Sequence, residues 1–265
     1  MDISIYIATH KKFKAPSIDG YKPIEVGADL RTRHFGYQRD NEGENISGKN
    51  STFCELTAYY WMWKHDKSDI VGLCHYRRYF SSRRIDINEK YFLTTDEVEN
   101  ILAYNDIILP EQFYWKYHDV KSGYTAGAGF EKDLNIIADI IGELFPEYLE
   151  EYIKILKEDR ASYCNMFITS RKQFDNYCEW LFIILFEAER RIDISEYSNS
   201  EKRIYGYISE ILLNVWVNKN KLRVYYNPMC FISSNGKKRK ILKLFDQYNC
   251  TRKITKIINC MDAIY

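Results

Sequence analysis

Residues 69–80 read Asp-Ile-Val-Gly-Leu-Cys-His-Tyr-Arg-Arg-Tyr-Phe, so an apolar run leads directly into a histidine, two arginines and two tyrosines. The nearly continuous apolar run at 70–74 is typical of a buried parallel strand. Ligands bind at the carboxyl ends of such strands in open α/β sheets. Because arginine keeps its charge and matches phosphate oxygens, Arg77 and Arg78 predict a site for a diphosphate or a similar anion. The alternative is a pair of structural salt bridges.

The composition fits one α/β domain at residues 1–235 with a C-terminal appendage. A formal net charge of +1 gives no global attraction for nucleic acid. The 7 cysteines are odd in number and form no Cys-x-x-Cys pair, which favours reduced thiols in a cytosolic protein. No signal peptide and no bilayer-spanning segment is visible. We therefore expect a cytoplasmic protein, either soluble or peripheral to the inner face of the plasma membrane.

Strand and helix patterns alternate along the chain, which predicts a mixed, mostly parallel sheet flanked by helices. The first strand, 3–8, runs into Thr9-His10-Lys11, and a polar loop with at most short strands fills 13–50. The other predicted strands are 69–76, 106–110, 163–168 and 222–226. The predicted helices are 52–65, 95–103, 131–144, 146–157, 172–191 and 204–219, with a loop at 111–130.

The composition changes from Gly236 onward, where basic residues interleave with apolar ones at helical spacing. This pattern predicts a basic amphipathic helical tail at 236–265. Such a helix can lie on an anionic membrane surface. It can equally pack on the domain as an ordinary basic helix.

Several nucleotide-binding signatures are absent, among them the phosphate loop and the Gly-x-Gly-x-x-Gly turn after the first strand. Many nucleotide-sugar enzymes hold a divalent metal with Asp-x-Asp at the end of an apolar strand. Here that place carries His75-Tyr76-Arg77-Arg78. Fixed cations can neutralise a departing diphosphate as a metal does, so we expect no metal site and no cofactor.

Two further segments are candidates for nucleotide contacts. Thr9, His10 and Lys11 would lie beside the arginine site if their strand neighbours 69–76; the alternative is a solvated basic loop. The segment from Asn45 to Lys49 precedes a helix N-terminus, which attracts anions. Simple capping and turn chemistry is the competing interpretation of that segment.

Polar residues inside apolar elements are the remaining candidates. Glu55 and Tyr59 share one helix face, and Glu55 is either a salt-bridge partner or a general base. Asn165 interrupts an apolar strand and needs a partner, either a backbone group or a sugar hydroxyl. Glu210 lies within an apolar helix, where a carboxylate is either paired or functional.

Taken together, seven segments resemble a bacterial family, domain of unknown function 4422, which is common in capsule and exopolysaccharide clusters and assigned as glycosyltransferases. The similarity runs from the first strand to about Trp216. The segments are Ile7-Ala8-Thr9-His10-Lys11, Asn45-Ile46-Ser47, Phe53-Cys54-Glu55-Leu56-Thr57-Ala58, Gly72-Leu73-Cys74-His75-Tyr76-Arg77-Arg78-Tyr79, Asp106-Ile107-Ile108-Leu109-Pro110, Tyr163-Cys164-Asn165-Met166-Phe167 and Gly206-Tyr207-Ile208-Ser209-Glu210.

The resemblance implies a GT-A-like glycosyltransferase domain, with Asn165 facing a sugar and Glu210 near the acceptor. Ile211 departs from a Ser-Glu-Arg pattern, and 111–130 matches only loosely. The residues expected at the nucleotide-sugar are Thr9, His10, Lys11, Asn45, Lys49, Tyr59, Tyr76, Asn165 and Met166. Those expected to carry the chemistry are Glu55, His75, Arg77, Arg78 and Glu210.

The resulting hypothesis is a metal-independent enzyme of capsule, exopolysaccharide or O-antigen synthesis. It would transfer a hexose, such as galactose or galactofuranose, from a UDP-sugar to a lipid-linked glycan. His75, Arg77 and Arg78 would stabilise the leaving UDP, and Glu55 or Glu210 would act as base. The alternatives are a non-catalytic glycan- or anion-binding module and, ranked last, a metal-dependent nucleotidyl- or phosphotransferase.

Overall fold

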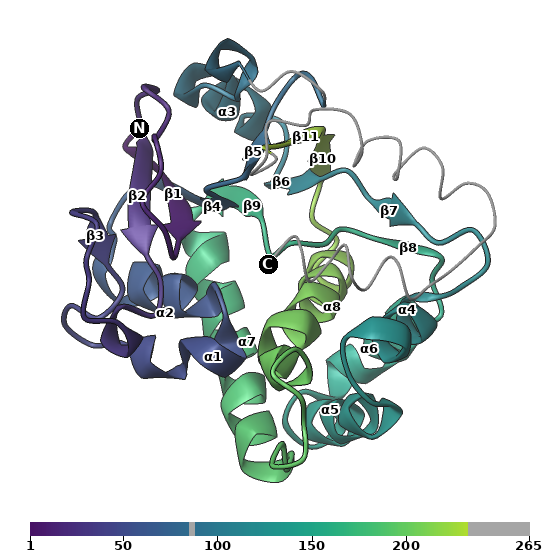
Figure 1. Ribbon diagram of the computed structural model, residues 1–265. Coiled ribbons are helices and arrows are strands. Elements are labelled where there is room, and N and C mark those ends of the chain that lie inside the picture. The colour runs from purple at the N-terminus through teal and green to yellow at the C-terminus, as the bar shows by residue number, and fades with distance from the viewer. Residues whose placement is uncertain (85–87, 233–265) are drawn as a thin grey trace.

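The computed structural model describes residues 1–84 and 88–232, and its centre is a twisted sheet (Figure 1). The strands follow the order β10-β6-β9-β4-β1-β2-β3. Their bounds are β1 Ile3–Thr9, β2 Tyr21–Glu25, β3 Gln38–Arg39, β4 Ile70–His75, β6 Ile107–Pro110, β9 Phe167–Ser170 and β10 Val224–Asn227. Strands β4, β1, β2 and β3 are parallel neighbours, as are β10 and β6. Since β9 is antiparallel to both β4 and β6, the predicted mixed, mostly parallel sheet is confirmed.

Two short pairings extend this plan. Strand β5 (Arg78–Phe80) continues from the end of β4 and pairs with β11 (Met229–Phe231). A separate ribbon joins β7 (Phe113–Tyr114) to β8 (Arg160–Ala161). The sequence pattern predicted neither β5 nor β11, because strands of three residues are too short to show a period.

The helices pack on the sheet through two apolar cores. Their bounds are α1 Asn50–Phe53, α2 Leu56–His65, α3 Thr95–Leu102, α4 Val120–Gly127, α5 Glu131–Leu144, α6 Pro146–Leu156, α7 Arg171–Arg191 and α8 Ile204–Lys219. Along β4, Val71 and Leu73 join the core shared with α2, α7 and α8, whereas Ile70 and Cys74 join the smaller core containing Val98 of α3. This alternation follows from the two-residue period of a strand. The sheet is therefore buried on both faces.

Three sequence predictions of local structure are wrong. The helix expected at 52–65 is broken at Cys54, which has a left-handed φ of 53° and so ends α1. The expected loop 111–130 contains β7 and α4, with Asp119 capping α4 by accepting a bond from the Ser122 amide at 2.7 Å. The strand expected at 163–168 begins only at Phe167, because Cys164 and Asn165 both have positive φ.

The other elements lie within a few residues of their predicted positions, and the expected polar loop 13–50 carries β2 and β3. The predicted tail 236–265 lies outside the described residues. Among residues 1–84 and 88–232, no helix has the length and apolar character that crossing a membrane requires.

Candidate active site

The ends of β1 and β4 lie side by side, which brings the two predicted nucleotide segments together. Ala8 is in register with His75, and the Tyr76 amide donates to the Ala8 carbonyl at 3.1 Å. The His10 ring meets the Tyr76 ring edge-on, with centroids 5.3 Å apart. Residues 9–11 therefore border the His75–Arg78 segment, as the sequence predicts for neighbouring strands.

His75 is buried at the end of β4 and serves as a neutral donor. Its Nε2 lies 2.7 Å from the Cys164 carbonyl oxygen. Burial lowers the pKa of His75 to about 4, with further lowering by Arg78 and opposition from Glu55. Because a carbonyl only accepts, Nε2 carries the proton at neutral pH and Nδ1 is the acceptor.

The Cys164–Asn165 turn is the strained centre of the site. The φ angles of Cys164 and Asn165 are 78° and 44°, and a non-glycine residue there costs on the order of 1–3 kcal/mol. The Asn165 side-chain amide donates to Glu55 Oε1 at 2.8 Å and to the Gly206 carbonyl at 2.9 Å, while its Oδ1 accepts from Ser209 at 2.9 Å. These bonds offset the strain, so Asn165 binds the turn to α2 and α8.

Two buried carboxylates approach this turn from different helices. Glu55 directly precedes α2 and is oriented by the left-handed break at Cys54. Glu210, on α8, accepts a bond from the Cys164 amide at 2.7 Å. The pKa of the Cys164 thiol is raised to about 11, mainly by burial, which Arg78 opposes and which Glu210 and Glu55 reinforce. The structure thus brings together Glu55, His75, Asn165 and Glu210, which lie far apart in the sequence.

The two adjacent arginines have different surroundings. Arg78 is 3% exposed, and its charge acts on both His75 and Cys164. Arg77 is half-buried; its Nε donates to the Ile232 carbonyl at 2.8 Å, and its guanidinium lies 4.7 Å from the Phe231 ring centroid. Arg78 therefore lies in the site, and Arg77 is bound to β11 and the residue after it.

Sequence reasoning missed Arg203, which directly precedes α8. Its Nε donates to the Cys54 thiol at 3.3 Å, and its charge lowers the pKa of both His10 and His75. A single basic residue between a lysine and an apolar helix carries no sequence signal of this role.

Other predicted nucleotide contacts have partners within the protein. Lys49 pairs with Glu189 of α7, with Nζ at 2.7 Å from Oε1. Asn45 accepts from the Ser47 amide at 3.0 Å, which is the turn chemistry given above as the competing interpretation. The Thr9 hydroxyl donates to the Lys11 carbonyl at 2.6 Å. Tyr59 and Met166 are fully buried, and the Tyr59 hydroxyl donates to the Asn165 carbonyl at 2.5 Å.

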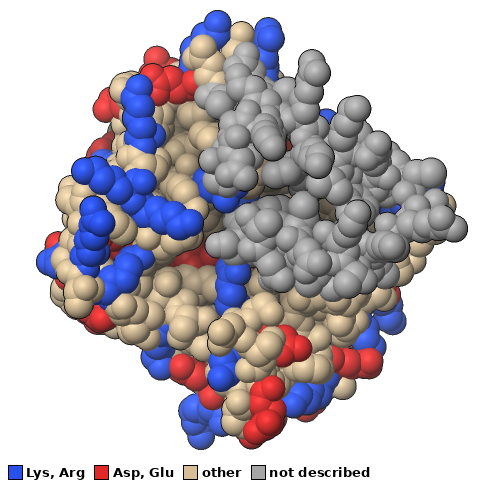
Figure 2. Space-filling model, viewed as in Figure 1, with Lys and Arg blue, Asp and Glu red and all other residues tan. Residues whose placement is uncertain are grey.

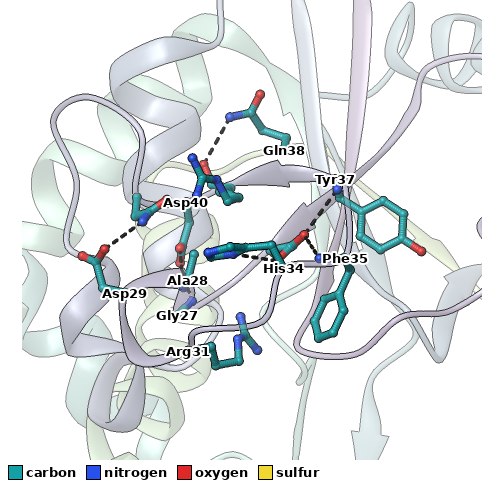
Figure 3. A network of polar contacts seen from close by, with 12 residues as sticks. Gly27, Ala28, Asp29, Arg31, His34, Phe35, Tyr37, Gln38 and Asp40 are labelled. Carbon is teal, nitrogen blue, oxygen red and sulfur yellow. Dashed lines mark hydrogen bonds and ion pairs between the residues drawn. The ribbon is translucent and has the colours of Figure 1, made fainter.

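A second polar network, at the end of β2, was also missed (Figure 3). Its centre is Asp40, a fully buried carboxylate that accepts from the Gly27 amide at 2.7 Å and the Ala28 amide at 3.0 Å. Glu25 is buried as well and accepts from the Phe35 amide at 2.6 Å. In the sequence, Glu25 and Asp40 appear only as two acidic residues in the predicted polar loop 13–50, so nothing there indicated this network.

Within the part of the chain that the structure describes, no cluster of three or more His, Cys, Asp or Glu side chains could hold a metal ion.

The fold and site define an α/β protein whose polar side chains meet at the carboxyl ends of β1 and β4. A family model described as a domain of unknown function, DUF4422, matches residues 4–221, and the chain belongs to this family.

No curated protein matches the chain. Among solved structures, the apo form of WbbM, described as a bifunctional glycosyltransferase, is similar with a TM-score of 0.82 and 31% sequence identity. The match covers 88% of this chain and 46% of that one. This chain thus spans less than half the length of WbbM and shares its α/β fold.

Proposed function

We propose that this chain is a glycosyltransferase that moves a hexose from a UDP-sugar to a lipid-linked glycan. The observation that carries the proposal is the similarity to WbbM, at 31% identity over 88% of this chain, a share that must include most of the elements around His75. Galactose or its furanose form is the proposed sugar, and the inner face of the plasma membrane is the proposed location. Contact through the basic tail belongs to the same proposal.

The geometry supports this chemistry through charge. Arg78 lies at the end of β4, where a leaving diphosphate gains negative charge, and the neutral His75 beside it binds the Cys164 carbonyl. Preorganised cations in a buried site stabilise such charge without reorganisation. Glu55 or Glu210 would deprotonate the attacking hydroxyl, a contribution of about two to four powers of ten in rate. In this scheme the guanidinium groups do the electrostatic work of a metal.

The test measures UDP release from UDP-galactose and its furanose isomer, with and without EDTA. We expect Arg78→Ala to lower turnover by roughly 100-fold or more, because a preorganised charge is lost. The turnover of Arg77→Ala measures whether Arg77, which contacts β11, also contributes to catalysis. Arg223→Ala is the matched control, since Arg223 pairs with Asp106 on the exposed surface between β6 and β10.

Two results would contradict the scheme. Unchanged turnover in both the Arg77 and Arg78 variants would remove the assigned role of the guanidinium groups. Loss of activity in EDTA, restored by Mn²⁺, would reject the metal-independent mechanism. UDP should also raise the melting temperature by mass action, whereas a glycan-binding module would respond to oligosaccharide alone.

A further inference from the structure

The turn that follows β2 lies beside the end of β1. The Val26 amide donates to the Thr9 carbonyl at 3.0 Å, so the chain leaves β2 next to residues 9–11. Gly27 then adopts a left-handed φ of 65°, and a short 3-10 helix covers Ala28–Leu30. Arg31 comes directly after this helix. Its backbone position is therefore set by the turn.

The turn is rigid because a buried carboxylate binds it (Figure 3). Besides the Gly27 and Ala28 amides, Asp40 accepts a bond from the Ser47 hydroxyl at 2.5 Å. The same hydroxyl accepts from the Asp29 amide at 3.2 Å. Bonds to an ionised acceptor are among the stronger ones in proteins, so this arrangement fixes the base of Arg31.

Arg31 has more hydrogen-bonding capacity than the described residues use. A guanidinium has five N–H donors. Its Nη2 donates to the Val26 carbonyl, its Nε is buried without an acceptor, and its Cζ lies 5.6 Å from the Phe35 ring centroid. Across residues 1–84 and 88–232, neither Arg31 nor Lys11 forms an ion pair with a carboxylate. A preorganised cation without a counterion is suited to bind an anion.

Other cationic side chains lie near His10, beside Arg31. Lys11, Arg31 and Arg203 come from three separate segments, yet all three are close enough to His10 to lower its pKa, which burial brings to about 4. Figure 2 shows Lys and Arg side chains gathered on this face over β1, β2 and β3. Like charges held together cost free energy, and a multiply charged ligand relieves that cost.

We propose that Arg31, with Lys11 and Arg203 beside it, binds the diphosphate of a nucleoside diphosphate on the His10 side of the site. This inference rests on the proposed function and names the groups that anchor its donor. The planar fork of Arg31 favours phosphate oxygens over a monovalent anion. Arg78 remains at the end of β4, on the His75 side.

Isothermal titration calorimetry with UDP, uridine and inorganic pyrophosphate tests the inference on the full chain. Arg31→Ala should weaken UDP binding by about 10- to 100-fold, the loss expected for a charge-assisted bond, and leave uridine binding unchanged. Arg33→Ala is the matched control, because Arg33 is exposed and only two residues from Arg31. The affinity of this variant for UDP should stay within about twofold of the wild-type value. Lys11→Ala, on an exposed side chain, should weaken UDP binding about three- to tenfold without affecting folding.

The outcomes separate the two proposals. Wild-type protein that binds UDP together with undiminished UDP binding in Arg31→Ala overturns this inference alone. Equal weakening of UDP and uridine also overturns it, because Arg31 would then act on the nucleoside or on the fold. Wild-type protein that binds neither UDP nor pyrophosphate refutes both the inference and the proposed donor. Should Arg31→Ala fail to fold, unchanged UDP binding in Lys11→Ala overturns the cationic anchor.

Discussion

Replacing Asp40 with alanine should destabilise the protein more than any surface substitution in the same loop. The carboxylate is fully buried and accepts three hydrogen bonds, from the Gly27 amide, the Ala28 amide and the Ser47 hydroxyl. Alanine would leave these donors buried without an acceptor. Each orphaned donor costs about 1–3 kcal/mol, and relaxation with entry of water recovers part of the total, so we expect a loss of about 3–5 kcal/mol in the free energy of unfolding.

Thermal unfolding followed by circular dichroism measures this loss. For a protein of this size, about 1 kcal/mol corresponds to roughly 2–4 °C in Tm, so Asp40→Ala should melt about 6–20 °C below wild type. Asp40→Asn keeps the shape and one acceptor oxygen and should lose about half as much. Asp29→Ala is the control, because Asp29 is exposed and accepts one bond, from Asn41 at 2.8 Å.

Equal melting temperatures of Asp40→Ala and Asp29→Ala would contradict this expectation. That result would mean that the Gly27–Ala28 turn finds other acceptors at little cost. The fixed base that the Arg31 proposal requires would then be absent as well.

Two further predictions concern the centre of the site. Since the pKa of His75 is about 4 in the folded protein against the usual 6.5, the unfolded chain binds a proton first as the pH falls; stability is full above pH 6.5 and declines by up to about 3 kcal/mol towards pH 4. His75→Gln should remove this contribution to the decline in Tm and leave that of His10, whose pKa is also about 4, and an unchanged slope would assign the decline to other groups. Gly206→Ala would place a Cβ 3.0 Å from the Cys54 sulfur, so it should displace Cys54, lower Tm and reduce UDP release. Gly142→Ala in α5, whose Cβ would lie 3.5 Å from Leu149, should instead raise Tm slightly; equal effects of the two substitutions would exclude the steric explanation.

The sequence predicts those parts of the fold whose signals are local. The apolar run before His75 correctly indicated β4, and the apolar period of 131–144 correctly indicated α5. The strand predicted at 163–168 fails because its apolar residues continue across a turn with two positive φ angles, and neither residue is a glycine that would mark the turn. Long-range hydrogen bonds create that turn, and no window of sequence contains them.

The same distinction applies to the candidate site. The segment His75–Arg78 and its neighbours 9–11 could be found, because the ends of parallel strands share one edge of a sheet. Arg203 and Arg31 could not. Arg203 enters the site by a contact to Cys54, 149 positions away, and Arg31 by a turn that Asp40 stabilises. Tertiary contacts, and not residue type, give these arginines their position.

Three of the candidate chemical groups act on one two-residue turn. His75 donates to the Cys164 carbonyl, Glu210 accepts from the Cys164 amide, and Glu55 accepts from the Asn165 side chain. In the proposed reaction, a proton taken up by either carboxylate weakens a bond that offsets the strain at this turn. The same step therefore loosens the turn whose Cys164 carbonyl fixes the tautomer of His75. The strain of the two positive φ angles therefore lies at the turn that both candidate bases and His75 contact.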